Sequence, residues 1–281
     1  MVKIIDIDSL FDKYIEGFVY ANIGKVKPEE IENKIPELYI KFGNEKLKEL
    51  DGKTPNTYYR DFSGEELLNC LENHLKQKVN ISDFLCEAIT NNLDNEDALI
   101  KALDKQEDEQ FLLYVLNMLG DINSKKAIKK YLEFILWDYS ESIREVATEL
   151  LCENAEEIKE DILKEFSEVS PVKKACLTEI LSNCKNDDRV FDILIAEFTK
   201  NQKDLPIYAS YLSKYGDDRA IPFLLNVIED EKISYADFEE LRFAIEALGG
   251  EYTKKRDFSK DKTYKKIKAN PSENSSTKED I

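Results

Sequence analysis

The sequence contains a single histidine, His74, among 281 residues. Serine and cysteine hydrolases of the triad type use a histidine as general base, so only His74 could serve such a mechanism. Glycine and proline are also scarce, with nine and seven residues, which argues against a fold of many short strands. No glycine-rich phosphate loop occurs. The adjacent glycines Gly249 and Gly250 follow a helical pattern and are typical of a helix cap. We therefore predict no catalytic residue.

Long apolar runs and paired cysteines are lacking as well. No run approaches the ~20 apolar residues needed to span a bilayer, and the first eight residues carry acidic side chains where a signal peptide needs a longer apolar core. The five cysteines are an odd number without CxxC spacing, and each lies among apolar residues, as in Ala175-Cys176-Leu177. Buried free thiols in a reducing compartment explain them. We expect a cytoplasmic protein that does not bind membranes.

Neither metal ligands nor paired carboxylates form a distinctive cluster. Cys70 and His74 lie four residues apart on a predicted helix, a spacing that suits two zinc ligands, but two further ligands are not close in the sequence. Adjacent acids such as Asp187-Asp188 lie near predicted helix starts, where they complement the helix dipole. We predict no metal site and no cofactor.

Acidic residues, by contrast, are abundant. Asp and Glu total 58 against 40 Lys and Arg, a formal charge of −18. Such a chain repels the phosphate backbone, so we predict a protein partner with basic groups at the contact and not a nucleic acid. The last stretch, 252–281, is different, with nine basic and five acidic residues and few apolar ones, which leaves −22 on the remainder. Its composition predicts a disordered tail that could fold back onto the acidic part or reach an anionic partner.

Helical periodicity runs through almost all of the rest. Phe111, Leu112, Val115, Leu116 and Leu119 illustrate it, with short polar connections between such stripes. Ser63 with Glu66 resembles a helix N-cap, and Pro36 should kink a helix or separate two shorter ones. From Ala127, similar helix-start residues recur at Ile158, Val190 and Ala220, which are steps of 31, 32 and 30 residues. Steps of this size are typical of two-helix repeats.

One turn, at residues 138–147 (DYSESIREVA), resembles the HEAT-like repeat family in its short variety. The resemblance covers about 94–250 and implies an all-α fold, an α-solenoid of antiparallel helix pairs. In that family a loop Asp and the following Arg form a ladder along the stack, so the resemblance gives Asp138 and Arg144 a structural role. We expect an N-terminal helical cap or degenerate repeats over 1–92, a repeat stack over 93–251 and the tail over 252–281.

Residues 51–62 interrupt the helical pattern with Gly52, Pro55 and two adjacent tyrosines. We predict a long connection there. Tyr and Arg are over-represented in interface hot spots, so Tyr58, Tyr59 and Arg60 are the candidate partner-binding residues. The alternative is that a tyrosine packs inward.

Three functions remain open from the sequence. The first is a non-enzymatic interaction or scaffold module that presents an acidic surface to a basic partner. The second is a HEAT-like enzyme, either a small-molecule lyase or a DNA glycosylase using Trp137-Asp138; however, Trp137 ends an amphipathic helix and is expected to close the core. The third is an inhibitor or immunity-type protein whose acidity mimics nucleic acid. The sequence does not decide the oligomeric state.

Overall fold

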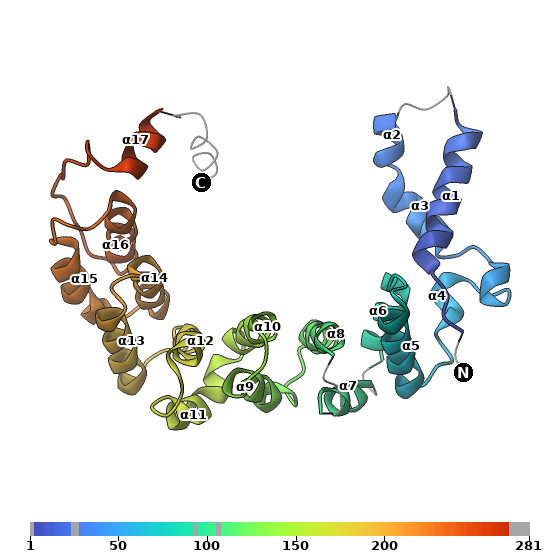
Figure 1. Ribbon diagram of the computed structural model, residues 1–281, viewed down its shortest axis with the longest axis horizontal. Coiled ribbons are helices and arrows are strands. Elements are labelled where there is room, and N and C mark those ends of the chain that lie inside the picture. Colours follow the sequence, from blue (N-terminus) through green and yellow to red (C-terminus); the bar gives the residue numbers. More distant parts are fainter. Residues whose placement is uncertain (1–2, 24–27, 93–94, 105–107, 270–281) are drawn as a thin grey trace. The chain divides into compact units, whose positions relative to one another are not determined.

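The computed structural model describes residues 3–23, 28–92, 95–104 and 108–269. Within these ranges the chain is all-helical and has no strand (Figure 1). It divides into two compact units, 1–147 and 148–281, and the boundary falls inside α10 (Glu141–Cys152). The boundary expected from the sequence, near residue 92, lies inside the first unit, because α5 contacts α7 and α6 contacts α8 across it.

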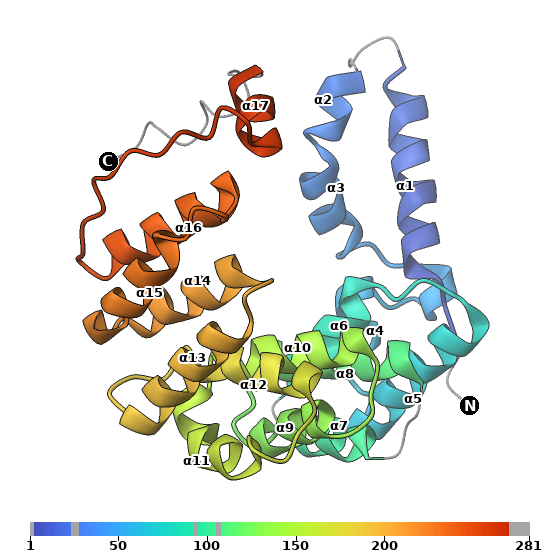
Figure 2. The same ribbon diagram turned by 60° about the vertical axis from the view of Figure 1, so that its left-hand side comes forward.

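The first unit contains short and medium helices that pack against close neighbours in the sequence. α1 and α3 lie side by side, as Figure 2 shows, and α5 contacts α6, α7 and α8. The elements are α1 (Ile7–Ala21), α2 (Pro28–Glu32), α3 (Ile35–Phe42), the 3-10 turn η1 (Lys48–Leu50), α4 (Pro55–Tyr58), α5 (Gly64–Gln77), α6 (Asp83–Thr90), α7 (Glu96–Leu103), α8 (Glu109–Asp121) and α9 (Ile128–Leu136).

Local sequence signals set several of these helix ends. The Ser63 hydroxyl accepts a hydrogen bond from the Glu66 N–H at 3.3 Å, and the Glu66 carboxylate accepts one from the Ser63 N–H at 2.9 Å. This reciprocal capping box starts α5 at the predicted place. Pro36 lies in the first turn of α3, where its missing N–H is tolerated, and α2 has already ended at Glu32. Two shorter helices therefore replace one kinked helix.

The second unit follows a simpler scheme, in which most helices contact the next one along the chain. α11 contacts α12, α12 contacts α13, and α13 contacts α14; α14 also packs closely against α16, the next α-helix but one. Gly216, with φ of +82°, ends α14 in the left-handed region that glycine adopts without strain. The elements are α11 (Ala155–Glu165), α12 (Pro171–Leu181), α13 (Asp188–Lys200), α14 (Leu205–Tyr215), the 3-10 turn η3 (Asp218–Ala220), α15 (Ile221–Ile228), α16 (Tyr235–Ala247) and α17 (Lys262–Ala269).

Two Asp-Asp-Arg turns of the second unit, 187–189 and 217–219, adopt the same local geometry. In each, the first Asp side chain accepts a hydrogen bond from the Arg N–H at 3.0 Å and also pairs with the Arg guanidinium. Each Arg then reaches a carboxylate about thirty residues earlier: Arg189 pairs with Glu160 at 2.6 Å and Arg219 with Asp188 at 2.8 Å. Arg219 therefore joins the two turns directly, and Arg189 joins its turn to α11.

These ion pairs are of the kind predicted for Asp138 and Arg144. In its own turn, the Arg144 guanidinium donates a hydrogen bond to the carbonyl of Tyr139. The ladder role of Asp138 and Arg144 stays a prediction. The ion pairs of Arg189 and Arg219 come from turns with Asp-x-Arg spacing, which is shorter than the spacing at 138–144.

The start of the predicted disordered tail is ordered against α15 and α16. Arg256 donates hydrogen bonds to the carbonyls of Ile228 and Asp230, both at 2.8 Å. The ring of Tyr235 contacts Phe258 and Tyr264 with centroids 5.2 and 5.0 Å apart. The prediction from overall composition missed this docking, because the docking depends on one arginine and a few aromatic residues within a lysine-rich stretch. The remainder of the tail, 270–281, lies outside the described residues.

Arg256→Ala should release this stretch. Loss of two hydrogen bonds from a charged donor should destabilise the docked form by about 2 kcal/mol, which corresponds to roughly thirtyfold faster cleavage after Phe258 by chymotrypsin. Limited proteolysis followed by mass spectrometry measures the rate. Lys255→Ala, which removes a neighbouring exposed side chain, should leave it unchanged; equal rates for the two variants would contradict the assigned role of Arg256.

Asp187→Asn tests how much the Asp187–Arg189 ion pair contributes to stability and how that contribution depends on pH. The hydrogen bond and charge of Arg189 hold the pKa of Asp187 well below its usual range. The carboxylate therefore contributes stability above the unfolded pKa of about 3.9, and this contribution is lost as the pH falls through the lower folded value. We expect the variant to be about 1 kcal/mol less stable in urea at pH 7, with the difference shrinking below about pH 4. Asp192→Asn, at an exposed position of α13, is the control and should show no such dependence.

Candidate functional site

The connection 51–62 folds into a tight turn followed by the short helix α4. Asp51 and Gly52 have φ of +55° and +78°, so the chain reverses there, and the Gly52 N–H donates to the Leu47 carbonyl at 2.9 Å. Thr54 and Thr57 then form a capping box that starts α4 at Pro55. The predicted long connection therefore contains a short helix, with Pro55 in its first turn.

This geometry turns both tyrosines inward. Tyr58 and Tyr59 are only 6% and 3% exposed, whereas Arg60 is exposed. The two tyrosine rings and Phe62 form a cluster, with centroids 4.9 to 5.5 Å apart. The Tyr59 hydroxyl is hydrogen-bonded to the Cys70 thiol, and burial raises the pKa of Tyr59 above its ordinary value. Both tyrosines pack inward, as the alternative allowed, and the partner-binding role of Tyr58, Tyr59 and Arg60 stays a prediction.

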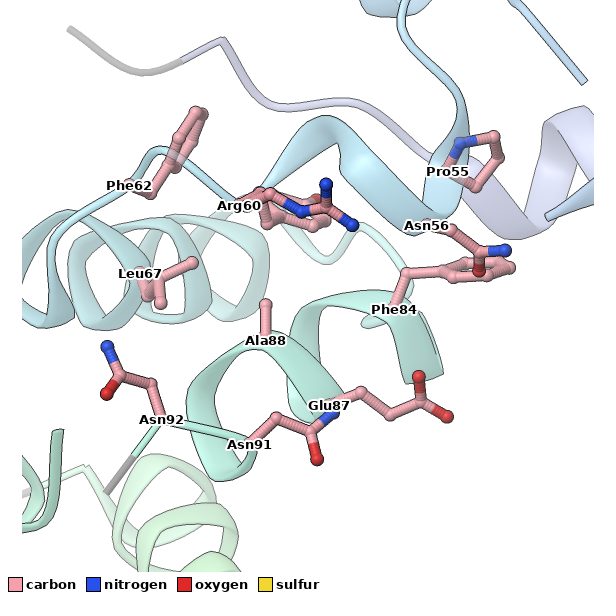
Figure 3. Close-up of a pocket in the computed structure, with 11 residues that line it drawn as sticks. Pro55, Asn56, Arg60, Phe62, Leu67, Phe84, Glu87, Ala88, Asn91 and Asn92 are labelled. Atoms are coloured by element: carbon pink, nitrogen blue, oxygen red, sulfur yellow. The ribbon is translucent and has the colours of Figure 1, made fainter. Parts of the chain in front are cut away.

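Tyr59 and Arg60 also line a surface pocket of about 320 Å³ between α4, α5 and α6 (Figure 3). Buried apolar side chains form its floor, and exposed polar side chains form its rim. The floor comprises Pro55, Tyr59, Leu67 and Phe84, and the half-buried Phe62 and Ala88 complete the apolar lining. The rim comprises Asn56, Arg60, Glu87, Asn91 and Asn92. An apolar floor inside a polar rim is the usual anatomy of a site that holds one side chain of a protein partner.

Acidic and aromatic groups adjoin this pocket through Phe84. The Phe84 ring stacks on Tyr39 with centroids 5.1 Å apart, and the Tyr39 hydroxyl donates to the Asp83 carboxylate at 3.4 Å. Desolvation raises the pKa of Tyr39, and the negative charges of Asp83, Asp8 and Glu87 raise it further. We call Asp8, Tyr39, Asp83, Phe84 and Glu87 the acidic-aromatic face.

The carboxylates at and around the acidic-aromatic face repel one another. Desolvation raises the pKa of Asp8, and the nearby charges of Asp6, Asp83 and Asp12 raise it again. A positive ligand group would relieve that repulsion. The arrangement is therefore chemically suited to an ammonium or guanidinium group.

His74, the side chain considered as a zinc ligand with Cys70, is fully enclosed. Its Nδ1 lies 2.8 Å from the Cys70 carbonyl oxygen and its Nε2 lies 3.2 Å from the Ile5 carbonyl oxygen. Both ring nitrogens are thus used by the backbone. In the part of the chain that the structure describes, no three His, Cys, Asp or Glu side chains are placed to hold a metal ion.

Trp137 differs from its expected position. It follows the last residue of α9 and is 57% exposed, so it does not close the core. Buried residues of α9, among them Ile128, Leu132 and Ile135, already fill the inward positions, and the extended backbone at residue 137 directs the chain away. Sequence reasoning missed this because an apolar side chain at a helix end was assumed to face inward.

Comparison with known proteins adds no family assignment. The chain matches no protein-family model, and no curated protein is similar to it in sequence. Among the described helices, none is both long and apolar enough to cross a membrane.

Tyr58→Ala and Arg60→Ala should differ strongly in stability, because Tyr58 is buried and Arg60 is exposed. Removing the buried Tyr58 ring should lower the free energy of unfolding by about 3–5 kcal/mol, while removing the exposed Arg60 side chain should change it by no more than about 0.5 kcal/mol. Urea denaturation followed by circular dichroism measures both. Similar losses for the two variants would contradict the inward placement of Tyr58.

Proposed function

We propose that this chain is a non-enzymatic protein-interaction module that presents an acidic surface to a basic partner. The observation that carries the proposal is the acidic-aromatic face beside the pocket. There, three carboxylates lie close enough to a stacked Tyr39–Phe84 pair to raise the pKa of Tyr39. With 58 acidic residues against 40 basic ones, the whole chain also attracts positive partners over longer distances.

The architecture proposed for this module is a HEAT-like α-solenoid with the first helices as a cap. Support comes from contacts between next-but-one helices, α5 with α7, α6 with α8 and α14 with α16, as expected when helix pairs stack. The ion pairs of Arg189 and Arg219 also span 29 and 31 residues, close to the repeat steps in the sequence. The free thiols described above agree with a cytoplasmic protein.

Partner binding would use the face and the pocket together. A Lys or Arg of the partner pairs with the exposed carboxylates of Asp83 and Glu87. A neighbouring apolar side chain fills the pocket floor above Leu67. The amide side chains at the rim can both donate to and accept from the partner's main chain.

A fluorescent peptide of alternating arginine and leucine is a suitable probe of this proposal. We expect it to bind the full chain with an affinity that falls as salt rises, and the double variant Asp83→Asn/Glu87→Gln to bind about tenfold more weakly, a loss of about 1.4 kcal/mol. Fluorescence anisotropy measures the affinity.

Glu45→Gln/Glu65→Gln is the matched control, because it removes two exposed carboxylates from the same unit outside the face. It should bind the peptide almost as well as the unmodified chain. An equal loss in both double variants would mean that net charge alone attracts the peptide, and salt-independent binding would exclude the electrostatic basis. Affinity purification from the native cell with mass spectrometry then identifies the partner.

A further inference from the structure

The docked stretch 252–269, here called the basic segment, has the opposite charge to the rest of the chain. It carries eight Lys or Arg and only two Asp or Glu, whereas residues 1–251 carry −22. The proposed acidic-aromatic face lies in the first unit, and the basic segment belongs to the second. It is therefore a separate feature that the proposed function does not use.

One side of the basic segment is fixed to α15 and α16. The Arg256 guanidinium is occupied by the Ile228 and Asp230 carbonyls and lies 5.3 Å from the centre of the Phe238 ring. The Asp261 carboxylate accepts hydrogen bonds from the N–H groups of Tyr235 and Tyr264 at 3.3 and 3.0 Å. The segment is thus held at defined points, and its last part, α17, packs against α16 (Figures 1 and 2).

The other side consists of exposed lysines. One lysine of the segment, Lys254, pairs with Glu229 at 2.6 Å. The other six are exposed, and within the described part of the chain none of them forms an ion pair. They are Lys255, Lys260, Lys262, Lys265, Lys266 and Lys268. Because the backbone beneath is docked, these charges are displayed on an ordered support and lose less entropy on binding than they would on a free tail.

We propose that the basic segment is a second interaction surface, which binds an acidic polypeptide segment of another protein. Charge complementarity carries the choice of an anion: six lysines without ion-pair partners stand close together on a chain of opposite net charge. The contact requires no particular geometry, because a lysine ammonium acts as a point charge.

The shape of the surroundings favours a polypeptide over a nucleic acid. Glu229 and Glu231 line a hollow of about 630 Å³ together with Lys254, Lys255 and Lys260, so carboxylates stand directly beside the lysines. A duplex is wider than an extended peptide and would bring phosphates against these acids. The aromatic rings of Phe258 and Tyr264 are occupied by Tyr235, which removes them as platforms for bases.

A membrane surface is also disfavoured. A helix that lies in the interface buries a broad apolar face, and α17 has only Ile267 as an exposed large apolar side chain. The acidic remainder of the chain would be repelled by anionic headgroups. An extended acidic peptide is narrower than a duplex and needs no broad apolar face, so it can follow the lysines.

Fluorescently labelled poly-L-glutamate is the probe, titrated with the full chain at about 50 mM and about 300 mM salt, a range over which screening of exposed charges increases strongly. We expect binding at the lower concentration and at least about tenfold weaker binding at the higher one. Lys260→Glu/Lys265→Glu/Lys266→Glu should weaken binding by at least about tenfold at low salt.

The matched control is Lys185→Glu/Lys203→Glu/Lys214→Glu, which changes the net charge equally at exposed positions of the same unit. It should weaken binding by less than about threefold. Equal losses in the two triple variants, or no binding of poly-L-glutamate at low salt, would overturn the proposal. Tighter binding of a DNA duplex, or of vesicles containing phosphatidylserine, would also overturn it. The arginine–leucine peptide should bind both triple variants, so failure here and failure of the proposed function are distinguishable.

Discussion

Most of the described fold depends on burying the apolar stripes of its helices against other helices nearby in the sequence. Short helices are marginal in isolation, since nucleation is costly and the apolar face is exposed to water. The contacts of α5 with α7 and of α14 with α16 bury such apolar faces. All of these contacts are between residues close in sequence, so the entropy cost of closing the chain between them is small.

The charged side chains contribute to this fold in a different way from the apolar ones. Ion pairs between exposed side chains contribute little to stability singly, and the Asp-Asp-Arg turns are better understood as setting the spacing between neighbouring turns. Asp187 is the central example: its carboxylate receives the Arg189 N–H, and its backbone N–H and carbonyl bond to the Tyr215 hydroxyl of the next helix pair at 2.9 Å each. Asp83 and Glu87, by contrast, are exposed carboxylates outside such turns.

Sequence reasoning succeeded where the physical cause is local. The capping box at Ser63 and the split of helices near Pro36 depend on groups within a few residues of each other, so their chemistry is visible in the sequence. It left alternatives open where tertiary packing decides. Nothing in the sequence fixes which way Tyr58 turns, because that depends on the turn at Asp51 and on Phe62. The acidic-aromatic face escaped prediction for the same reason, since Asp8 and Asp83 meet only through the packing around α1, α3 and α6.

The docked basic segment shows how far average composition can mislead. Lysine-rich, apolar-poor stretches are expected to be disordered because they cannot bury enough surface to offset the loss of chain entropy. Here the ion pair of Lys254 with Glu229 lowers the electrostatic cost of holding eight basic residues together, and Arg256, Phe258 and Tyr264 supply specific contacts. Attraction of this kind is non-directional, whereas the hydrogen bonds of Arg256 are directional. Their combination explains why the segment can be held in one place while most of its lysines stay exposed.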